Sequence, residues 1–355
     1  MVVAGLRVVS LSAEPPRPDS AAEMHLREIA DGLERLGHSV RRVWAPTSEA
    51  SRLLRLVRFQ TSQWRAVRAA DVLYLRWHVL SPVHMLLARL LGVPYVLEVN
   101  GTSEDIVTAY PGLAKVRPAL KWLTSLEFRG ASHIIVVSPG LVTWARRMAR
   151  DRTPVSYLPN GAPDALSERR RAPDSPPYAV FVGELAGWQG IDTLLRAAQS
   201  PQWPADLDLV VVGSGASAEA VAEASSSGRI RYKGRLGRNE AWDVLAGAVM
   251  SISPQTGRLA RNRLGVTPLK VSESLMLGVP VVASDLPGQA ELLNGAPSSV
   301  VVEPDLPEAF AEAVRQLAET SHDRAAISRY GVDNASWSRT ARETGTILEG
   351  VVGRA

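Results

Sequence analysis

The sequence predicts an α/β protein built from two tandem Rossmann-like domains, each a doubly wound parallel sheet, with a cleft between them. Short aliphatic or β-branched runs alternate with longer amphipathic stretches, and this alternation stops once and then restarts. Repeated strand, helix, strand units require crossover connections, so the strands are parallel and helices cover both faces. The length of 355 residues is also that of about two domains at roughly 150 residues each.

The first domain is expected over residues 1–168. Its predicted strands cover residues 6–11, 39–44, 72–77, 94–99, 133–137 and 155–158. Its predicted helices cover residues 22–36, 51–69, 82–91, 118–130 and 140–150. The pattern then stops at ERRRAPDSPP, where a basic run meets clustered prolines, so residues 169–177 are predicted to be a linker.

The second domain is expected over residues 178–325, where the alternation restarts. Its predicted strands cover residues 178–183, 207–212, 230–233, 249–252, 279–284 and 299–302. Its predicted helices cover residues 191–199, 216–225, 239–248, 268–277 and 289–293. Helical patterns at 306–319 and 337–351 follow, and we expect residues 326–355 to brace the two domains. Ligands of doubly wound sheets bind beyond the carboxyl ends of the strands, so the cleft is the predicted active site.

The composition excludes several classes of function. The absence of cysteine rules out a disulfide scaffold, a thiolate zinc site, an iron–sulfur cluster and a cysteine nucleophile, and it fits a reducing cytosol. The longest apolar runs, 86–91 and 279–283, are far shorter than the ~20 residues that cross a bilayer. The N-terminal residues do not resemble a signal peptide. We therefore expect a cytoplasmic protein.

The charge predicts a mild preference for anionic partners. The net charge is +4 and the isoelectric point is about 9.5. The basic residues are dispersed, so a nucleic acid is not indicated as a partner. A basic stretch over 51–68 is compatible with contact to anionic lipid or with a solvated helix face, and both interpretations stay open. Lysine is rare, so a lysine in a functional segment stands out.

The strongest local signal is the segment 265–284, which begins GVTPLKVSE. Thr267 is a candidate N-cap and Pro268 a candidate first helical residue, so the free amides of this helix start would form an anion site. Lys270 lies in the first turn, where a cation opposes the helix dipole unless an anion neutralises both. Many helices begin with Thr-Pro, and Lys270 could simply extend into solvent. The segment alone therefore leaves an anion site and an ordinary helix start as alternatives.

A longer series of motifs spans nearly the whole chain. The first half carries, in order, AAEMHLREIADGLERLGHSV, DVLYLRW, PYVLEVNG, HIIVVSPGL and VSYLPNGAPD. The second half carries FVGELAGWQGIDTLLRA, VVVGSG, RIRYKGRLGRNEAWDVLAGAVMSISP, GVTPLKVSESLMLGVPVVASDLPGQAELL and ASWSRTARETGTILEG. Each motif is loose, but together and in this order they resemble the family-4 glycosyltransferases.

This resemblance implies the GT-B fold and metal-independent transfer of a sugar, with retention at the anomeric carbon. The co-substrate would be a nucleoside-diphosphate sugar, a UDP-sugar or a GDP-sugar, with no other cofactor. The acceptor would be a small molecule or glycan that carries a hydroxyl group and binds to the first domain. A bacterial enzyme of natural-product or polysaccharide biosynthesis is the expected setting.

The resemblance also assigns residues to the donor. Glu273 occupies the place of the second glutamate of an E-x7-E pattern, which holds the ribose, whereas Gly265 stands at the first. Backbone amides around Thr267 and Leu269 would then contact the donor sugar. Thr267 and Lys270 are expected to stabilise the departing diphosphate.

Two cations of many family members are missing after the first strand of the second domain. The matching positions are Glu184 and Gln189. A diphosphate without cations would lose charge-assisted hydrogen bonds worth roughly 1.5–3 kcal/mol each. Lys270 is therefore expected to be the principal diphosphate ligand and Arg263 the second, whereas a solvated loop is favoured for Arg258 and Arg261. Further donor contacts are assigned to Gly183, Gly213 and Leu236.

Acceptor contacts are assigned to the carboxyl ends of the third and fourth strands. The candidates are His25, Arg76, His78, Glu98, Asn100 and Gly101. Asn100 stands where many relatives have histidine, and it is the candidate catalytic residue on this side. It can donate a hydrogen bond to a sugar hydroxyl while the departing phosphate takes the acceptor proton. For His25, local packing is an alternative, and for Glu98, an internal ion pair with Arg76 is one.

Two other functions stay open. Glu184, Gln189 and Gly265 depart from the family pattern, which would also fit a nucleotide-binding partner without catalysis. A related enzyme could instead form an S-linked, N-linked or other non-O-glycosidic bond. NAD chemistry is disfavoured, because no G-x-G-x-x-G follows the first strand.

Overall fold

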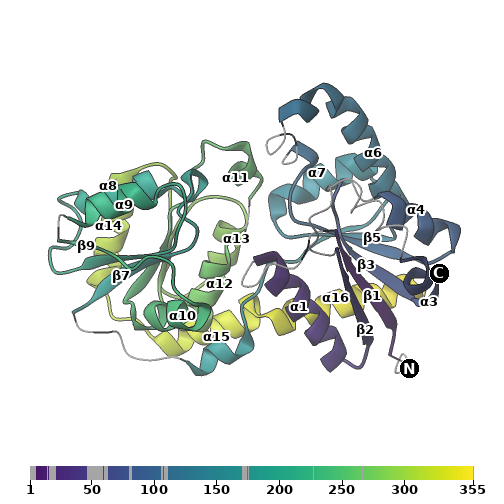
Figure 1. Ribbon diagram of the computed structural model, residues 1–355. Helices are drawn as coiled ribbons and strands as arrows, with labels where there is room; N and C mark the ends of the chain where they lie inside the picture. The colour runs from purple at the N-terminus through teal and green to yellow at the C-terminus, as the bar shows by residue number, and fades with distance from the viewer. Residues whose placement is uncertain are drawn as a thin grey trace. The chain divides into compact units, whose positions relative to one another are not determined.

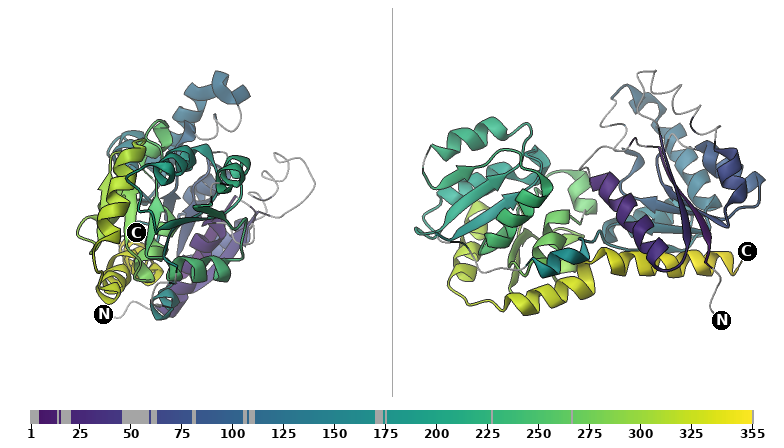
Figure 2. Two further views of the ribbon diagram at one scale, coloured as in Figure 1. Left: turned by 90° about the vertical axis from the view of Figure 1, so that its left-hand side faces the viewer. Right: turned by 60° about the horizontal axis from the view of Figure 1, so that its bottom comes forward.

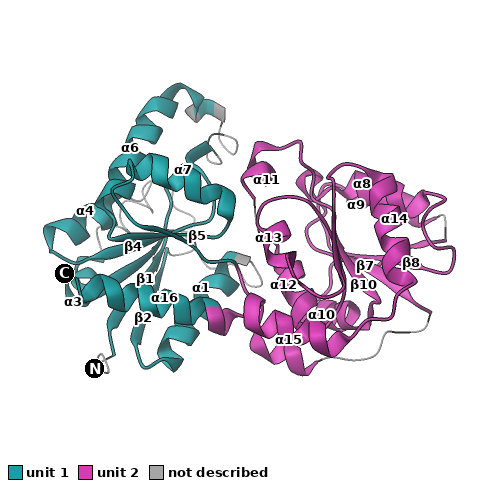
Figure 3. Ribbon diagram, turned by 180° about the vertical axis from the view of Figure 1, so that it is seen from behind, with its two compact units in different colours: residues 1–159, 340–355 teal, residues 160–339 magenta. Residues whose placement is uncertain are grey.

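The computed structural model describes residues 5–354 except 14, 16–20, 46–58, 60–62, 80–81, 105–106, 108–110, 170–173, 175, 227 and 266. The chain forms two compact units, shown in different colours in Figure 3. Unit 1 contains Met1–Pro159 and Thr340–Ala355, and unit 2 contains Asn160–Arg339.

Unit 1 is a parallel sheet in the strand order β2-β1-β3-β4-β5-β6. The strands are β1 (Arg7–Ser12), β2 (Ser39–Trp44), β3 (Val72–Arg76), β4 (Tyr95–Val99), β5 (His133–Val136) and β6 (Val155–Tyr157). The helices between them are α1 (Ala21–Arg35), α3 (Trp64–Ala69), α4 (Pro82–Leu90), η1 (Pro111–Val116), α6 (Arg117–Gly130) and α7 (Pro139–Ala149). Buried aliphatic strands of this kind need cover on both faces.

The helices of unit 1 divide between the two faces of its sheet. The chain moves from β1 to β2 in one direction and from β2 to β6 in the other, so right-handed crossovers place α1 opposite α3, α4, α6 and α7. Figure 1 shows α4, α6 and α7 on one side and α1 on the other. The C-terminal helix α16 (Trp337–Val352) packs on α1, where a Cβ added at Gly32 would lie 2.3 Å from the Cβ of Ala341.

Unit 2 is a parallel sheet in the order β12-β11-β10-β7-β8-β9. The strands are β7 (Tyr178–Val182), β8 (Asp208–Val212), β9 (Ile230–Tyr232), β10 (Met250–Ser253), β11 (Val281–Ser284) and β12 (Ser299–Val302). The helices are η2 (Asp164–Glu168), η3 (Gly187–Gln189), α8 (Ile191–Gln199), α9 (Ala218–Ser225), α10 (Arg238–Gly247), α11 (Ala260–Leu264), α12 (Leu269–Met276), α13 (Gln289–Leu293), α14 (Pro307–Ala318) and α15 (Arg324–Ala335). Figure 2 shows these layers from two further sides. The core lies between sheet and helices around Phe181, Ile252 and Phe310.

The predicted fold class is confirmed, and each predicted strand is present within two residues of its expected ends. Among the described residues, the α-helices α11 and α15 and the 3-10 helices η1, η2 and η3 were not predicted. Helix α15 contains Gly331 and Asn334, which favour helix weakly. It forms because Asp323 accepts hydrogen bonds from the amides of Ala325 and Ala326, and because Ser328 donates to the carbonyl oxygen of Met276 at 2.7 Å. Most of the predicted helix 51–69 lies outside the described residues, and α3 is its described part.

The division into units falls earlier than the expected boundary at residue 168. Residues 160–168 belong to unit 2. The amide of Ala162 donates to the carbonyl oxygen of Ala335 at 2.7 Å, and the amide of Trp337 donates to the carbonyl oxygen of Ala162 at 3.0 Å. The final residues, Thr340–Ala355, return to unit 1. Of the expected linker 169–177, residues 170–173 and 175 lie outside the described part.

Candidate functional site

The candidate donor site lies at the carboxyl edge of the unit 2 sheet. Strands β7 and β10 are neighbours, and the chain leaves them in opposite directions, so this is the point where ligands of doubly wound sheets bind. Helix α12 begins at this edge, with Lys270 in its first turn. Gly183 follows β7 here, and a Cβ added to it would lie 3.1 Å from the Nζ of Lys270.

Lys270 is a buried cation with a neutral partner. Its side chain is 5% exposed, and its Nζ donates a hydrogen bond of 3.0 Å to the Oε1 of Gln189. The same nitrogen lies 3.7 Å from the centre of the Phe181 ring. Burial lowers the pKa of Lys270 to about 7, against the opposing effect of Glu273. Within the part of the chain that the structure describes, no carboxylate forms an ion pair with this ammonium group.

The start of α12 differs in detail from the predicted one. Pro268, not Thr267, is the N-cap residue, and its backbone is extended. Thr267 is 1% exposed, and its carbonyl oxygen accepts from the Nδ2 of Asn160 at 3.2 Å. The capping prediction was wrong by one residue, because Pro268 has an extended backbone and the helix begins at Leu269.

Gly265 has a backbone reason for being glycine. Its φ is +87°, and a Cβ there would lie 2.3 Å from the carbonyl oxygen of Pro287. A glutamate at this position would require the backbone to move. Gly213, beside the candidate nucleoside site, is similar, because a Cβ there would lie 1.8 Å from the carbonyl oxygen of Gly183. The loops after β7 and β8 thus pack backbone against backbone.

Glu273 lies one turn beyond the start of α12 and is 8% exposed. The Nε1 of Trp242 donates to its Oε1 at 3.0 Å. Burial raises the pKa of Glu273, opposed by Trp242, Arg238 and Lys270. The sequence contains no signal for the Trp242 contact, since Trp242 is on a different helix, α10.

The other candidate donor residues differ in exposure. Glu184 is exposed, and Leu236 and Leu269 are half-buried. The predicted second cation, Arg263, is exposed and donates to the carbonyl oxygen of Gly257 at 3.0 Å. Arg261 stacks on Trp188, with its guanidinium carbon 5.0 Å from the ring centre. The structure therefore joins Lys270 to Gln189, places Arg261 against Trp188 of η3, and leaves Arg263 hydrogen-bonded to Gly257.

The candidate acceptor side has a buried carboxylate, Glu98, at its centre. Its Oε2 accepts from the Tyr74 hydroxyl at 2.6 Å and lies 2.9 Å from the Nε2 of His25. Its Oε1 accepts from Arg76 at 2.7 Å and from the Nδ2 of Asn100. Glu98 is 0% exposed. Burial alone would raise the pKa of Glu98, but His25, Arg76 and Tyr74 hold it well below its usual range.

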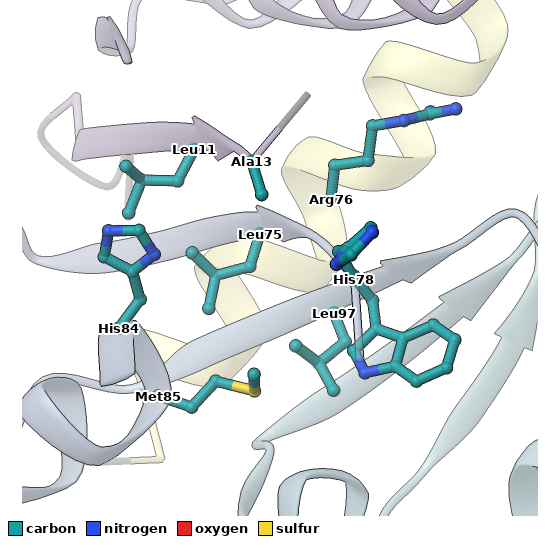
Figure 4. Close-up of a pocket in the computed structure, with 9 residues that line it drawn as sticks. Leu11, Ala13, Leu75, Arg76, His78, His84, Met85 and Leu97 are labelled. Carbon is teal, nitrogen blue, oxygen red and sulfur yellow. The ribbon is translucent and has the colours of Figure 1, made fainter. Parts of the chain in front are cut away.

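This cluster brings together four predicted residues, His25, Arg76, Glu98 and Asn100. Glu98 cannot reach a ligand from its buried place. Its role is therefore the internal ion pair with Arg76, and it orients the side chains of His25, Arg76 and Asn100. Tyr74 of β3, which is 1% exposed, was not among the predicted residues. His78 and Gly101 are half-buried near the same edge. Figure 4 shows Arg76 and His78 at one end of a small pocket and His84 at the other.

Two family models match the chain. The model described as "Glycosyl transferase 4-like domain" matches residues 1–161, and the one described as "Glycosyl transferases group 1" matches residues 176–320. The chain belongs to the GT-B glycosyltransferases. The first of these models covers the strands of the unit 1 sheet, and the second covers the strands of the unit 2 sheet.

Individual relatives of this glycosyltransferase are distant. The α-D-kanosaminyltransferase of Streptomyces kanamyceticus is 23% identical over 65% of the chain, a match that spans 63% of that protein. Among solved structures, sucrose-phosphate synthase from Thermosynechococcus elongatus has a TM-score of 0.73 at 16% identity, over 99% of this chain and 100% of that one. Anabaena HepE in complex with UDP has a TM-score of 0.72 at 15% identity, over 97% and 100%. These structural likenesses establish the fold.

Neither a membrane-spanning helix nor a metal-binding cluster is present among the described residues. No helix there is long and apolar enough to span a membrane. No group of three or more histidine, aspartate or glutamate side chains within the described ranges is arranged to hold a metal ion.

Proposed function

We propose that this glycosyltransferase transfers a sugar from a nucleoside-diphosphate sugar to a hydroxyl group of a small molecule or glycan, with retention and without a metal ion. Unit 2 would bind the donor and unit 1 the acceptor, in the cytoplasm. The observation that carries the proposal is the buried Lys270 ammonium, whose hydrogen bond goes to a neutral amide. A solved structure of HepE, which has the same fold, contains UDP-glucose.

The charge balance at Lys270 favours an anionic ligand. A buried ammonium group is costly unless it is paired, and its hydrogen bond to Gln189 compensates the lost hydration only in part. The amides at the start of α12 add a positive potential at the same edge. A diphosphate would neutralise both, and the gain would increase as negative charge develops on the leaving group.

The remaining roles follow from position. We assign Glu273 to the ribose, held in orientation by Trp242. Asn100, fixed by Glu98, would orient the acceptor hydroxyl. In a retaining front-face reaction the departing phosphate would accept the hydroxyl proton, so no protein base is required. The bond between the anomeric carbon and the phosphate oxygen would break as the new glycosidic bond forms on the same face.

A partner without catalysis is the second candidate. It was suggested by Glu184, Gln189 and Gly265, but Gly265 has its own backbone explanation. Both candidates predict nucleotide binding and differ in turnover.

A two-step experiment tests the proposal. Calorimetric titration with UDP and GDP identifies the base, and transfer from the matching nucleotide sugar is then followed by NMR with EDTA present. We expect binding of one nucleotide and a product with the donor's anomeric configuration. Absence of binding to both nucleotides would refute the donor site, and an inverted product would refute retention.

A further inference from the structure

The outer helical face of unit 1 combines exposed apolar side chains with cations. Helices α3, α4 and α6 pack side by side on this face. Leu90 is 75% exposed, Trp122 62% and Leu86 58%. We call this surface the α3/α4/α6 face. Its exposed apolar residues are Trp64, Leu86, Leu90, Trp122 and Leu126, and its exposed cations are Arg65, Arg68, Arg89, Lys115, Arg117 and Lys121.

The two helices that carry most of the apolar residues meet at their C-terminal ends. A Cβ added at Gly130, the last residue of α6, would lie 2.9 Å from a guanidinium nitrogen of Arg89 on α4. Leu86 and Leu90 are four residues apart on α4, and Trp122 and Leu126 are four apart on α6, so each pair forms a ridge on its helix. Apolar side chains of this size are normally covered by a partner when they gather on one surface.

The α3/α4/α6 face contains no exposed acid within the described residues of α3, α4, η1 and α6. Glu127 is the acid in these elements, and it is 4% exposed. Arg117 pairs with Glu104 at the margin, at 3.2 Å. The opposite face of the sheet differs, because α1 there carries acids that pair with arginines. The sheet of unit 1 is thus polarised in charge, with cations and apolar groups together on one side.

We propose that the α3/α4/α6 face docks on an anionic lipid surface. Tryptophan and leucine would enter the interfacial region while lysine and arginine contact lipid phosphates. A second copy of the chain fits less well, because a two-fold interface would bring the same cations against each other. A nucleic acid would leave Leu86 and Leu90 exposed. This proposal does not depend on the donor site. It adds that the enzyme would act at a membrane surface.

Vesicle flotation of the full chain tests this proposal. One set of vesicles contains equal parts of phosphatidylcholine and phosphatidylglycerol, and the other contains phosphatidylcholine alone. We expect the wild-type protein to float with the anionic vesicles and to stay in solution with the neutral ones. A protein that ignores both kinds of vesicle, or binds both equally, would overturn the proposal.

Two double variants and two matched controls define the surface. Leu90→Ser with Trp122→Ser removes apolar contact, and Lys115→Glu with Lys121→Glu reverses charge. Each is expected to weaken binding roughly tenfold or more, because each buried apolar side chain and each cation near the surface contributes on that scale. The controls change unit 2 or the other face of unit 1: Leu306→Ser with Val332→Ser, and Arg329→Glu with Arg342→Glu. They are expected to bind as the wild type does.

Other outcomes would contradict the proposal. Equal loss in the controls, or unchanged flotation of both face variants, would contradict docking through this face. Light scattering that shows a dimer abolished by Leu90→Ser with Trp122→Ser, without vesicle binding, would assign the face to a second copy. Thermal unfolding of each variant verifies that the fold is retained.

Discussion

The two sheets each bury an ionisable side chain at the carboxyl edge, and the two side chains have different partners. Glu98 in unit 1 is surrounded by Tyr74, His25, Arg76 and Asn100, so its charge is balanced inside the protein. Lys270 in unit 2 has the neutral Gln189 as its hydrogen-bond partner. The polar groups around Glu98 in unit 1 therefore satisfy one another. Lys270 in unit 2 has no anionic partner among the described residues, and an anionic ligand could pair with it.

The largest expected effect is on turnover. Lys270→Met keeps the length of the side chain and removes its charge, so stabilisation of the leaving diphosphate is lost. We expect turnover to fall about 10³-fold, or about 4 kcal/mol. Steady-state kinetics measure this, with the exposed Lys233→Met as the control. Unchanged turnover in Lys270→Met would remove the residue from the mechanism.

The next effect is on the stability of unit 1. Glu98→Gln leaves Arg76 without its buried counter-charge, so we expect the free energy of unfolding to fall by about 3 kcal/mol. Urea unfolding measures it, with the exposed Glu104→Gln as the control. If Glu98→Gln is no more costly than its control, the cluster around Glu98 does not have the structural role assigned to it.

Glu127 is a second buried carboxyl group of unit 1, and unlike Glu98 it has few polar partners. Its Oε2 accepts from Trp77 at 2.8 Å, and its Oε1 has no hydrogen-bond partner among the described residues. Burial raises the pKa of Glu127 to about 8. The stability that the protonated form provides is complete below the unfolded pKa of about 4.5 and is lost as the pH rises through about 8.

Glu127→Gln should remove this pH dependence. We expect the variant to be more stable than the wild type by about 2 kcal/mol at pH 9, with little difference at pH 4. Unfolding curves at several pH values provide the measurement. A stability difference that does not change with pH would show that Glu127 is ionised or neutral throughout.

The smallest expected effect concerns donor affinity. Trp242→Phe keeps an aromatic ring but removes the hydrogen bond to Glu273, so nucleotide binding should weaken about fivefold, or about 1 kcal/mol. Calorimetry with the ribonucleotide and its 2′,3′-dideoxy analogue shows whether the loss concerns the ribose. Trp122→Phe, on unit 1, is the control. Equal losses for both nucleotides would contradict an action through the ribose.

The sequence predicted the fold because strand and helix periods are local. Lys270 and Glu273 were placed correctly on one helix start for the same reason, since their spacing of three residues fixes their relation on the helix. The contacts from Gln189, Phe181 and Trp242 could not be predicted, because they join separate elements and depend on side-chain direction. Thr267 was misassigned as a cap, since the choice between it and Pro268 depends on backbone angles that the sequence does not specify.

Proton uptake on nucleotide binding tests the central claim most directly. At pH 8 most Lys270 side chains are neutral, because their pKa is about 7, and a bound diphosphate would raise that pKa and recruit a proton. Calorimetry in two buffers of different ionisation enthalpy counts the protons. The account predicts uptake approaching one proton in the wild type and none in Lys270→Met. Equal proton counts in the two proteins would contradict it.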